Sequence, residues 1–374
     1  MKLTIERAAL LTALTHTQSV VERRNTIPIL SNVLMDANDG KLRLTATDLD
    51  LAIVDHAEAE IATAGSTTTP AHTLYDIVRK LPEGAQIELA FGEEAGETRV
   101  SLMAGRSSFL LPCLPKEDFP VMAEGELPHN FTMSAQILTD IIDKTRFAVS
   151  TEETRYYLNG IYLHVAEEAG QPVLRAVATD GHRLAQVNAP MPGGAAEMPG
   201  VIVPRKAVAE LRKLIDEGGL DVGVSLSDSK IRFQVGESVL TSKLIDGTFP
   251  DYQRVIPEGN DKIMEVDAKV FAGAIDRVST VSTEKSRAVK MSLEGGKATI
   301  AANSPDNASA SEEIAVDYDS DNIEIGFNSR YLLDIASQID GDTAQFLLAD
   351  SVSPTLIRDG GNADTLYVLM PMRV

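Results

Sequence analysis

The residues that could do acid–base or metal chemistry are few in this chain, and their spacing fits no common catalytic site. The six histidines never take a metal-ligand spacing such as HExxH, and the single cysteine, Cys113, has no partner for a CxxC pair. Phosphate-binding loops of the GxGxxG and GxxxxGK[ST] types and the nucleophile motif GxSxG are also absent from the sequence. The sequence therefore predicts no cofactor, no metal and no covalent catalysis.

Two short groups of residues do have the types that such sites use. Asp48 and Asp50 form a DxD pair, which binds a metal in some proteins, and Asp180 stands near His182 as an acid beside a base. The stretch around Asp48 aligns with the stretches around Asp180 and Asn303, so we interpret the aspartate as a turn residue. An enzyme that uses Asp180 and His182 stays open as an alternative, although neither a nucleophile nor a metal set accompanies them.

The elements that carry these residues occur three times along the chain. Their first part reads TIERAALLTAL, TMSAQILTDII and EVDAKVFAGAI, at residues 4–14, 132–142 and 265–275. In each copy a polar residue suited to beginning a helix precedes apolar residues four, seven and eight positions later. The polar residues are Glu6, Ser134 and Asp267. Each copy covers about a third of the chain, which is the size of a domain and larger than a solenoid repeat of roughly 20–50 residues.

We therefore expect an α+β protein of three similar domains, each with two helices and mainly antiparallel sheets. The predicted order within one copy is strand, helix, several strands, helix and several strands, which differs from the alternation of a βαβ fold. The expected domains are residues 1–122, 129–252 and 257–374. The connections between them, near 121–130 and 251–263, each follow a Phe-Pro pair and contain further proline and glycine.

Composition and charge narrow the class of protein. The formal net charge is -21, which argues against a general nucleic-acid binder but leaves room for one basic face. The single cysteine excludes an internal disulfide and is typical of a reducing compartment. The first residues, MKLTIERAALL, lack the apolar run of a signal peptide, and no stretch approaches the ~18 apolar residues of a membrane span. We expect a soluble cytoplasmic protein without a membrane partner.

Seven stretches, in order along the chain, resemble the β sliding clamp family of bacterial DNA polymerase III. They are RRNTIPILSNVL, TATDLDL, RYYLNG, VATDGHRLA, VPRKAVAEL, TSKLIDGTFPDYQRVIP and VLMPMRV, at residues 23–34, 45–51, 155–160, 177–185, 203–211, 241–257 and 368–374. The resemblance implies the DNA clamp fold, in which the helices of each domain face inward and the antiparallel sheets face outward. It also implies a head-to-tail homodimer that closes a ring of six domains.

The function that this resemblance implies involves no chemistry. The ring encircles duplex DNA, contacts its phosphates without reading sequence, and keeps a polymerase in place. The implied partners are the clamp loader, the DNA polymerase III alpha subunit, and other polymerases and repair proteins that carry a clamp-binding peptide. A paralogue with the same ring, specialised for repair or antibiotic resistance, is the alternative.

Basic residues cluster in the predicted helices and in the loops at their ends. From these clusters and from the resemblance, the expected DNA contacts are Arg24, Arg155, Tyr156, Tyr157, Arg205 and Lys206. Ordinary solvation of a helix surface is the alternative for each cation, and aromatic packing is the alternative for the two tyrosines.

The family also implies a pocket for the partner's peptide between the second and third domains. The matching residues are Leu158, Thr179, Gly181, His182, Arg183, Leu184, Pro250, Arg254, Val255, Asn328, Tyr331, Val352, Val368, Met370, Pro371, Met372 and Arg373. Their apolar members form an adaptable groove, and Arg183 and Arg373 are expected to hold a carboxylate or a carbonyl of the peptide. A structural imidazole is the alternative for His182, and a last core strand is the alternative for VLMPMRV.

The resemblance implies a subunit interface as well. Phe109 and Leu111 of the first domain are expected to face Thr280 and Val281 of the third domain of a second copy. Thr280 is more polar than the aliphatic residue that this position leads us to expect. Pro354 also departs from the small polar residue common in the family, and it removes a backbone donor near the pocket.

Overall fold

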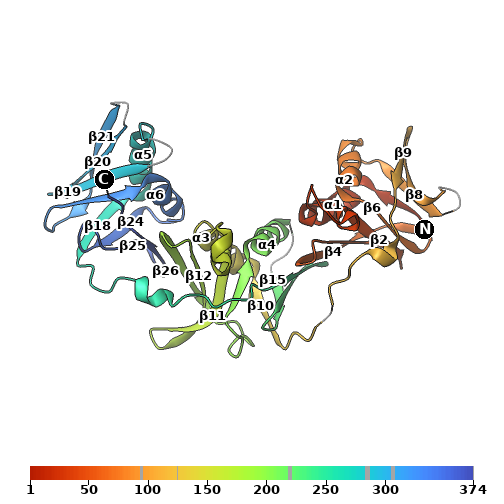
Figure 1. The fold of residues 1–374 in the computed structure, drawn as a ribbon, viewed down its shortest axis with the longest axis horizontal. Coiled ribbons are helices and arrows are strands. Elements are labelled where there is room, and N and C mark those ends of the chain that lie inside the picture. Colours follow the sequence, from red (N-terminus) through yellow and green to blue (C-terminus); the bar gives the residue numbers. More distant parts are fainter. Residues whose placement is uncertain (93–95, 124, 218–220, 283–286, 305–307, 374) are drawn as a thin grey trace. The chain divides into compact units, whose positions relative to one another are not determined.

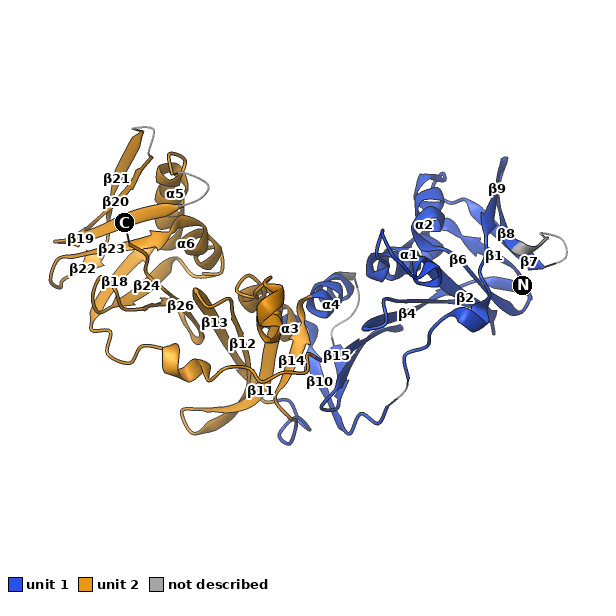
Figure 2. Ribbon diagram, viewed as in Figure 1, with its two compact units in different colours: residues 1–136, 192–198, 206–244 blue, residues 137–191, 199–205, 245–374 orange. Residues whose placement is uncertain are grey.

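The structure, a computed structural model, describes residues 1–92, 96–123, 125–217, 221–282, 287–304 and 308–373 (Figure 1). It combines α-helices with antiparallel strand pairs, as the sequence predicts. The described part divides into two compact units (Figure 2). Unit 1 holds residues 1–136, 192–198 and 206–244, and unit 2 holds residues 137–191, 199–205 and 245–374.

Unit 1 contains two sheets. The first has the order β5 (Glu60–Thr63), β1 (Lys2–Glu6), β7 (Gln86–Gly92), β8 (Gly96–Ala104) and β9 (Ser107–Pro112). The second has the order β10 (His129–Ser134), β15 (Asp221–Leu226), β16 (Lys230–Val235), β17 (Ser238–Lys243), β4 (Leu51–Glu58), β3 (Lys41–Thr47), β2 (Asn32–Asn38) and β6 (Gly65–Pro70). Short 3-10 turns lie at η1 (Pro28–Ser31) and η2 (Lys116–Asp118).

Helix α1 (Arg7–Val20) of unit 1 packs on β3, on β4 and on helix α2 (Ala71–Lys80). Leu10, Ala13 and Leu14 of α1 are buried, so the apolar positions of the predicted pattern form the face that meets the sheet. Most of helix α4 (Arg205–Glu217) also belongs to this unit.

Unit 2 contains the other two sheets. One has the order β14 (Val201–Pro204), β11 (Gly160–Glu168), β12 (Gln171–Thr179), β13 (Arg183–Pro190), β26 (Asn362–Leu369), β25 (Thr355–Asp359), β24 (Thr343–Leu348), β18 (Lys262–Asp267) and β22 (Asp317–Tyr318). The other has the order β21 (Ser309–Ala315), β20 (Lys297–Asn303), β19 (Ala288–Glu294) and β23 (Ile323–Asn328). The 3-10 turns here are η3 (Glu153–Leu158) and η4 (Tyr252–Val255).

The helices of unit 2 are α5 (Ala268–Ser279), α6 (Ser329–Ala336) and most of α3 (Ala135–Arg146). Helix α5 packs on α6, β20 and β21. Its Phe271 lies in the core, with its ring centroid 4.9 Å from that of Phe346 on β24. One apolar core therefore joins the helix pair of this unit to both of its sheets.

The first helix of each repeat begins where the sequence predicts. Helices α1, α3 and α5 start directly after Glu6, Ser134 and Asp267. The Glu6 carboxylate accepts hydrogen bonds from the backbone N–H groups of Ala8 and Ala9, at 2.7 and 3.1 Å. Asp267 accepts one from Val270 at 2.8 Å. These side chains satisfy N–H groups that have no partner inside the helix.

Two strand pairings connect segments that the predicted domain boundaries separate. Strand β17 pairs with β4 in unit 1, and β13 pairs with β26 in unit 2. Because each pairing makes a continuous sheet, the middle third of the chain contributes strands to both units. The boundaries 1–122, 129–252 and 257–374 stay a prediction. None of the described helices has the length and apolar character that crossing a membrane requires.

Candidate partner-binding site

One cavity of unit 2 brings together residues from four separate segments of the chain. Its volume is about 160 Å³, and it lies among the end of η3, the turn between β12 and β13, the segment around η4, and the end of β26. The residues that line it are Leu158, Thr179, Gly181, His182, Arg183, Leu184, Pro250, Asp251, Tyr252, Val255, Val368 and Met370. All of these except Asp251 and Tyr252 are in the predicted pocket.

The side chains of the turn between β12 and β13 hold its backbone in place. The Asp180 carboxylate accepts hydrogen bonds from the N–H groups of His182 and Arg183, at 2.9 and 3.0 Å. The Thr179 hydroxyl accepts one from the N–H of Gly181 at 3.1 Å and donates one to the carbonyl of Arg183 at 2.7 Å. Such bonds from short polar side chains to the nearby backbone define Asx and Ser/Thr turns. The predicted turn role of Asp180 is therefore confirmed.

Two features favour glycine at position 181 of this turn. Its φ is 87°, in the left-handed region that residues with a side chain rarely adopt. A Cβ atom there would also lie 2.5 Å from Nη1 of Arg155. The glycine therefore lets Arg155 lie close to the turn at the rim of the cavity.

The Arg183 side chain is buried, and each of its three guanidinium nitrogens already donates a hydrogen bond. Nε donates to Asp180 at 3.2 Å, Nη1 donates to Asp334 at 2.5 Å, and Nη2 donates to the carbonyl of Phe147 at 2.5 Å. The guanidinium carbon lies 4.3 Å from the centroid of the Tyr331 ring. These contacts do not support the expected role of Arg183 in holding a peptide carboxylate. They show instead a residue that fixes the turn to helix α6.

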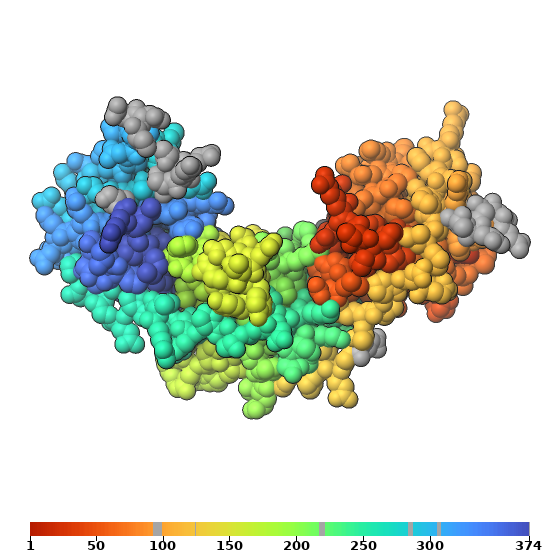
Figure 3. Space-filling model, in the orientation of Figure 1, coloured from red at the N-terminus to blue at the C-terminus, as the bar shows by residue number. Residues whose placement is uncertain are grey.

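The last strand of the chain forms another side of the cavity. On β26, Val368 pairs with Leu184 of β13 and with Leu356 of β25, so the strand lies inside the sheet. Leu369 is fully buried, whereas the next residue, Met370, is 40% exposed. The N–H of Met370 donates to the carbonyl of His182 at 2.9 Å. In the space-filling view the dark-blue C-terminal residues lie at the surface of unit 2 (Figure 3). Residues 368–369 therefore end a core strand, and the exposed rim of the cavity begins at Met370.

Stacked rings position the segment around η4. The ring centroids of Tyr162 and Phe249 lie 4.8 Å apart, and those of Tyr162 and His164 lie 4.6 Å apart. Burial lowers the pKa of His164, so its imidazole is neutral at pH 7. Its Nδ1 faces the carbonyl of Val165 at 2.9 Å and carries the proton, so Nε2 accepts from the Tyr252 hydroxyl at 3.0 Å. Sequence reasoning missed Tyr252, although this aromatic residue stands inside the FPDYQRV stretch.

The other predicted pocket residues lie outside the lining of this cavity. They are Arg254, Asn328, Tyr331, Val352, Pro371, Met372 and Arg373. Arg254 bonds to Asp251 at 2.7 Å with its side chain 83% exposed, and Asn328 accepts from the N–H of Arg330 to begin helix α6. Tyr331 stacks on His182, with 6.2 Å between ring centroids, and so contacts a residue of the lining. Val352 is 73% exposed on a loop, next to which Pro354 accepts from Asn260.

The whole chain matches the three domains of one protein family. Residues 1–123, 132–251 and 253–373 match the N-terminal, central and C-terminal domains of the DNA polymerase III beta subunit. The chain belongs to the DNA polymerase III beta subunit family. It is 55% identical over 374 residues to the beta sliding clamp of Caulobacter vibrioides, with 100% of both chains covered. It is 38% identical over 375 residues to the beta sliding clamp of Escherichia coli K12, again with 100% of both covered.

Solved structures of beta subunits have the same fold. The sliding clamp of Caulobacter crescentus matches with a TM-score of 0.95 and 54% identity, and the match covers 100% of both chains. The clamp of Bartonella birtlesii, solved bound to griselimycin, matches with a TM-score of 0.96 and 52% identity, also over 100% of both chains. At this similarity the family assignment holds over the full length of the chain.

The cations expected to contact DNA differ in how far acidic residues neutralise them. Arg24 and Arg205 are exposed and form no ion pair with described residues. Arg155 forms two hydrogen bonds with Glu152, at 2.9 and 2.6 Å. These bonds raise the pKa of the Arg155 guanidinium above its usual value. Lys206 bonds to Asp48 and to the carbonyl of Val20. Lys206 therefore connects α4 to the 47–51 turn, and its ammonium is already occupied.

The two expected tyrosines lie in η3 of unit 2. Tyr156 is 53% exposed, and its ring meets that of Tyr157 edge to face, with 5.8 Å between centroids. Tyr157 is half-buried and packs against the cluster under the cavity, which includes Leu158 and Phe249. Packing therefore explains Tyr157, whereas Tyr156 is open to a ligand.

The residues expected at the subunit interface lie on two elements and differ in how far they are exposed. Phe109 and Leu111 lie on β9, which is an edge strand of its sheet. Leu111 is already buried in its own unit, and the neighbouring Leu110 is 49% exposed, a residue that sequence reasoning missed. Thr280 ends helix α5, and Val281 packs on the core of unit 2.

The aspartates whose spacing suggested metal or acid–base chemistry bond to groups of the protein itself. The Asp48 carboxylate accepts from the N–H groups of Asp50 and Leu51, at 3.0 and 2.7 Å, which repeats the turn of Asp180. Among the described residues no group of three or more His, Cys, Asp or Glu side chains could hold a metal ion. The carboxylates of Asp48 and Asp180 thus both bond to the backbone of their own turns.

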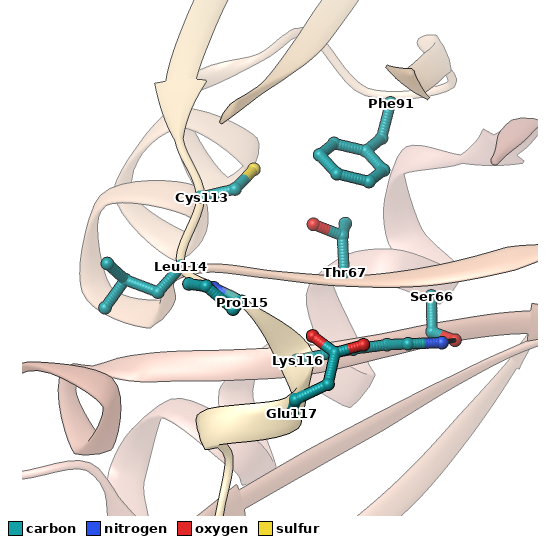
Figure 4. A pocket seen from close by; sticks show the side chains of 8 residues that line it. All are labelled: Ser66, Thr67, Phe91, Cys113, Leu114, Pro115, Lys116 and Glu117. Carbon is teal, nitrogen blue, oxygen red and sulfur yellow. Dashed lines mark hydrogen bonds between the residues drawn. The ribbon is translucent and has the colours of Figure 1, made fainter. Parts of the chain in front are cut away.

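A larger cavity, of about 320 Å³, lies in unit 1 beside the end of β9. Figure 4 shows Cys113 on one side of it, with Phe91 and Thr67 across the space and the Lys116 amine beside Ser66. Burial raises the pKa of the Cys113 thiol, so the thiol stays protonated and is a weak nucleophile at neutral pH. None of the predicted pocket residues lines this cavity.

Proposed function

We propose that this chain is a DNA sliding clamp, which encircles duplex DNA and tethers the replicative polymerase to it. The observation that carries the proposal is the match of all three of its domains to the beta subunit family, with 55% identity to a beta sliding clamp over the full length. The chain performs no chemistry in this role and works in the cytoplasm. Its domains are residues 1–122, 129–252 and 257–374.

A ring needs little affinity for the DNA that it surrounds, which agrees with a net charge of -21. Acidic outer surfaces repel DNA, and a few exposed cations suffice for sliding contacts with phosphates. We assign these contacts to Arg24, Tyr156 and Arg205, which are exposed, and to Arg155, which bonds to Glu152 through Nε and Nη2 only and keeps its Nη1 for a phosphate. Lys206 is left out because its ammonium already bonds to Asp48, and Tyr157 is left out because it packs inward.

The cavity of unit 2 receives the peptide of a partner. Its lining is mostly apolar, through Leu158, Leu184, Val255, Val368 and Met370, and the backbone of the 179–183 turn adds polar groups at one side. Such a lining suits short peptides with apolar anchors. The partners are the DNA polymerase III alpha subunit, other polymerases, repair proteins and the clamp loader.

Two copies close the ring by pairing free sheet edges. Strand β9 of unit 1 and strand β21 of unit 2 are each the last strand of their sheets. An unpaired edge exposes a row of backbone donors and acceptors, and pairing with a second copy covers it. Phe109 and Leu111 belong to one of these edges, and Thr280 and Val281 lie at the end of the helix that packs on the other.

The test is retention on DNA of different topology. Purified protein is loaded on a nicked circular plasmid by a clamp loader, the plasmid is isolated by gel filtration, and the bound protein is measured before and after one cut by a restriction enzyme. We expect the cut to release at least nine-tenths of the protein, since a ring slides off an end. Protein that stays on the linear plasmid at the same ionic strength binds by contact instead of topology, and that result would refute the clamp.

A further inference from the structure

The eight-stranded sheet of unit 1 has a cavity of about 250 Å³ on the side facing away from helix α1. Asp55 on β4 bonds to His16 of α1, and neighbours along a strand alternate between its two faces. Val54 and His56, which line the cavity, therefore face away from the helix. This cavity shares no residue with the cavity of unit 2.

The floor of the cavity is apolar. Four neighbouring strands, β3, β4, β17 and β16, contribute to it. In the central row Thr45 pairs with Val54, and Val54 pairs with Val239. Ala52 lies in the next row, between Thr47 and Thr241. The methyl groups of these residues offer a contact surface for one or two apolar side chains.

Residues 120–122 form one wall of the cavity. We call this short segment the strap. The strap is fixed at both ends. On one side Phe119 is buried against Ile29 and Leu30. On the other side the Lys230 ammonium donates to the carbonyl of Ala123 at 2.7 Å. The Val121 side chain in the middle is 80% exposed, so an apolar group stands uncovered at the mouth of the cavity.

Every ionisable side chain that lines the cavity is an arginine or a histidine. Arg43, His56 and Arg232 line it, and no aspartate or glutamate does. Within the described part of the chain neither arginine forms an ion pair, and Nε of Arg232 is shielded from water without a hydrogen-bond partner. The nearby Lys41 differs, because it binds both Glu58 and Glu237. Asp36 stands opposite Arg43 on the neighbouring strand β2 but forms no ion pair with it and does not line the cavity. In a protein of net charge -21, a cavity without an acidic residue in its lining suits an anionic ligand.

The two arginines stand at opposite corners of the floor. Arg232 pairs with Thr241, whose row continues through Ala52 to Thr47, and Arg43 lies four residues before Thr47 on the same strand. Three steps between strands and four residues along a strand put their Cα atoms roughly 20 Å apart. One phosphate is too small to bridge that distance. An extended chain of about six residues spans it.

We propose that this cavity binds an extended segment of a partner protein, about six residues long, with an acidic residue near each end and apolar residues between them. The acidic residues pair with Arg43 and Arg232, and the apolar residues lie on the floor against the strap. This site adds a second class of partner to the proposed clamp, and it does not depend on DNA binding or on the cavity of unit 2.

The proposal is tested with two pools of fluorescein-labelled hexapeptides and the full-length protein. One pool has aspartate at the first and sixth positions and a mixture of glycine, valine and leucine between them, and the matched pool has asparagine at both ends. Fluorescence anisotropy is expected to show at least tenfold tighter binding of the aspartate pool, and this difference should shrink with added salt. Arg232→Glu and Val121→Asp are each expected to weaken that binding at least tenfold. Val121→Asp changes an exposed side chain, so it leaves folding intact.

Lys269→Glu is the control for a general charge effect, because Lys269 is an exposed cation on helix α5 of unit 2. It should leave the affinity unchanged. Equal binding of the two pools, or binding that survives both Arg232→Glu and Val121→Asp, would overturn the proposal. So would inorganic phosphate that competes as strongly as the aspartate peptides, since it would define a small-anion site. Binding that disappears when residues 370–374 are removed would place the peptide in the cavity of unit 2 and would also overturn it.

Discussion

The turns at residues 47–51 and 179–183 use the same side-chain bonds but different residues at the third position. In both, a threonine hydroxyl and an aspartate carboxylate bond to the nearby backbone. The third residue is Leu49 in one and Gly181 in the other, with φ of 81° and 87°. A leucine in the left-handed region is strained, because its Cβ approaches the following carbonyl.

Leu49→Gly is expected to stabilise the protein. The substitution relieves the backbone strain, which outweighs the lost contacts of a side chain that is 42% exposed, and we expect a gain of about 1 kcal/mol in the free energy of unfolding. Urea titration followed by circular dichroism measures it. The matched variant is Gly181→Ala, which should lose stability, since an alanine rarely adopts a φ of 87° and the Arg155 guanidinium would also have to move away from its Cβ. A loss of stability in Leu49→Gly would show that the leucine side chain matters more than the turn.

At the scale of elements, the cavity of unit 2 depends on how one strand and one helix hold a turn. Strand β26 pairs with β13, and α6 supplies Asp334 and Tyr331 to the Arg183 guanidinium. Arg183 is therefore a positioning residue for the cavity. Its removal leaves Asp180 without its cation and leaves Asp334 with only Arg330, 4.0 Å away, in a partly buried place.

We expect Arg183→Met to cost about 3 kcal/mol of unfolding free energy, the usual effect of breaking a buried ion pair. Binding of a polymerase-derived peptide should weaken as well, because the 179–183 turn is no longer fixed. Arg183→Lys should rescue little, since one ammonium cannot reproduce a fork of three nitrogens. Arg254→Met is the control, as that side chain is 83% exposed. If Arg183→Met bound peptide more weakly while unfolding at the same urea concentration, the guanidinium would contact the peptide directly.

At the scale of the whole molecule, the edges of the sheets are the feature that bears on association between two copies. Strand β9 is short and ends its sheet, and the exposed Leu110 lies on it. An exposed apolar edge strand favours association with another strand, whereas a lysine there disfavours it. The proposed dimer therefore depends on β9 more than on any single contact.

Leu110→Lys is expected to raise the dimer dissociation constant at least tenfold. Sedimentation across a range of concentrations should then show a larger fraction at 40.2 kDa than in the unmodified protein. Ile263→Lys serves as the control, because Ile263 is 48% exposed on β18, which lies inside its sheet. A dimer of unchanged strength in Leu110→Lys would exclude β9 as the pairing edge.

The starts of the first helices and the roles of the short turns could be predicted from the sequence. Helices begin after Glu6, Ser134 and Asp267 because a polar residue and the spacing of the apolar residues that follow it favour a helix there. The turns at Asp48 and Asp180 depend on bonds between each carboxylate and the nearby backbone. Both kinds of feature involve residues only a few positions apart. Much of the lining of the unit 2 cavity could also be predicted, because the family resemblance assigns these distant segments to one pocket.

Only the tertiary structure decided the partners of the charged side chains. Arg183 and Lys206 look like free cations in the sequence, yet each is bonded to acids, Asp334 and Asp48 respectively, that lie far away along the chain. Arg43 and Arg232 look no different, yet they remain unpaired around one cavity. Strand pairing between distant segments determines which charges meet, and no local pattern encodes that pairing because it depends on the packing of whole sheets.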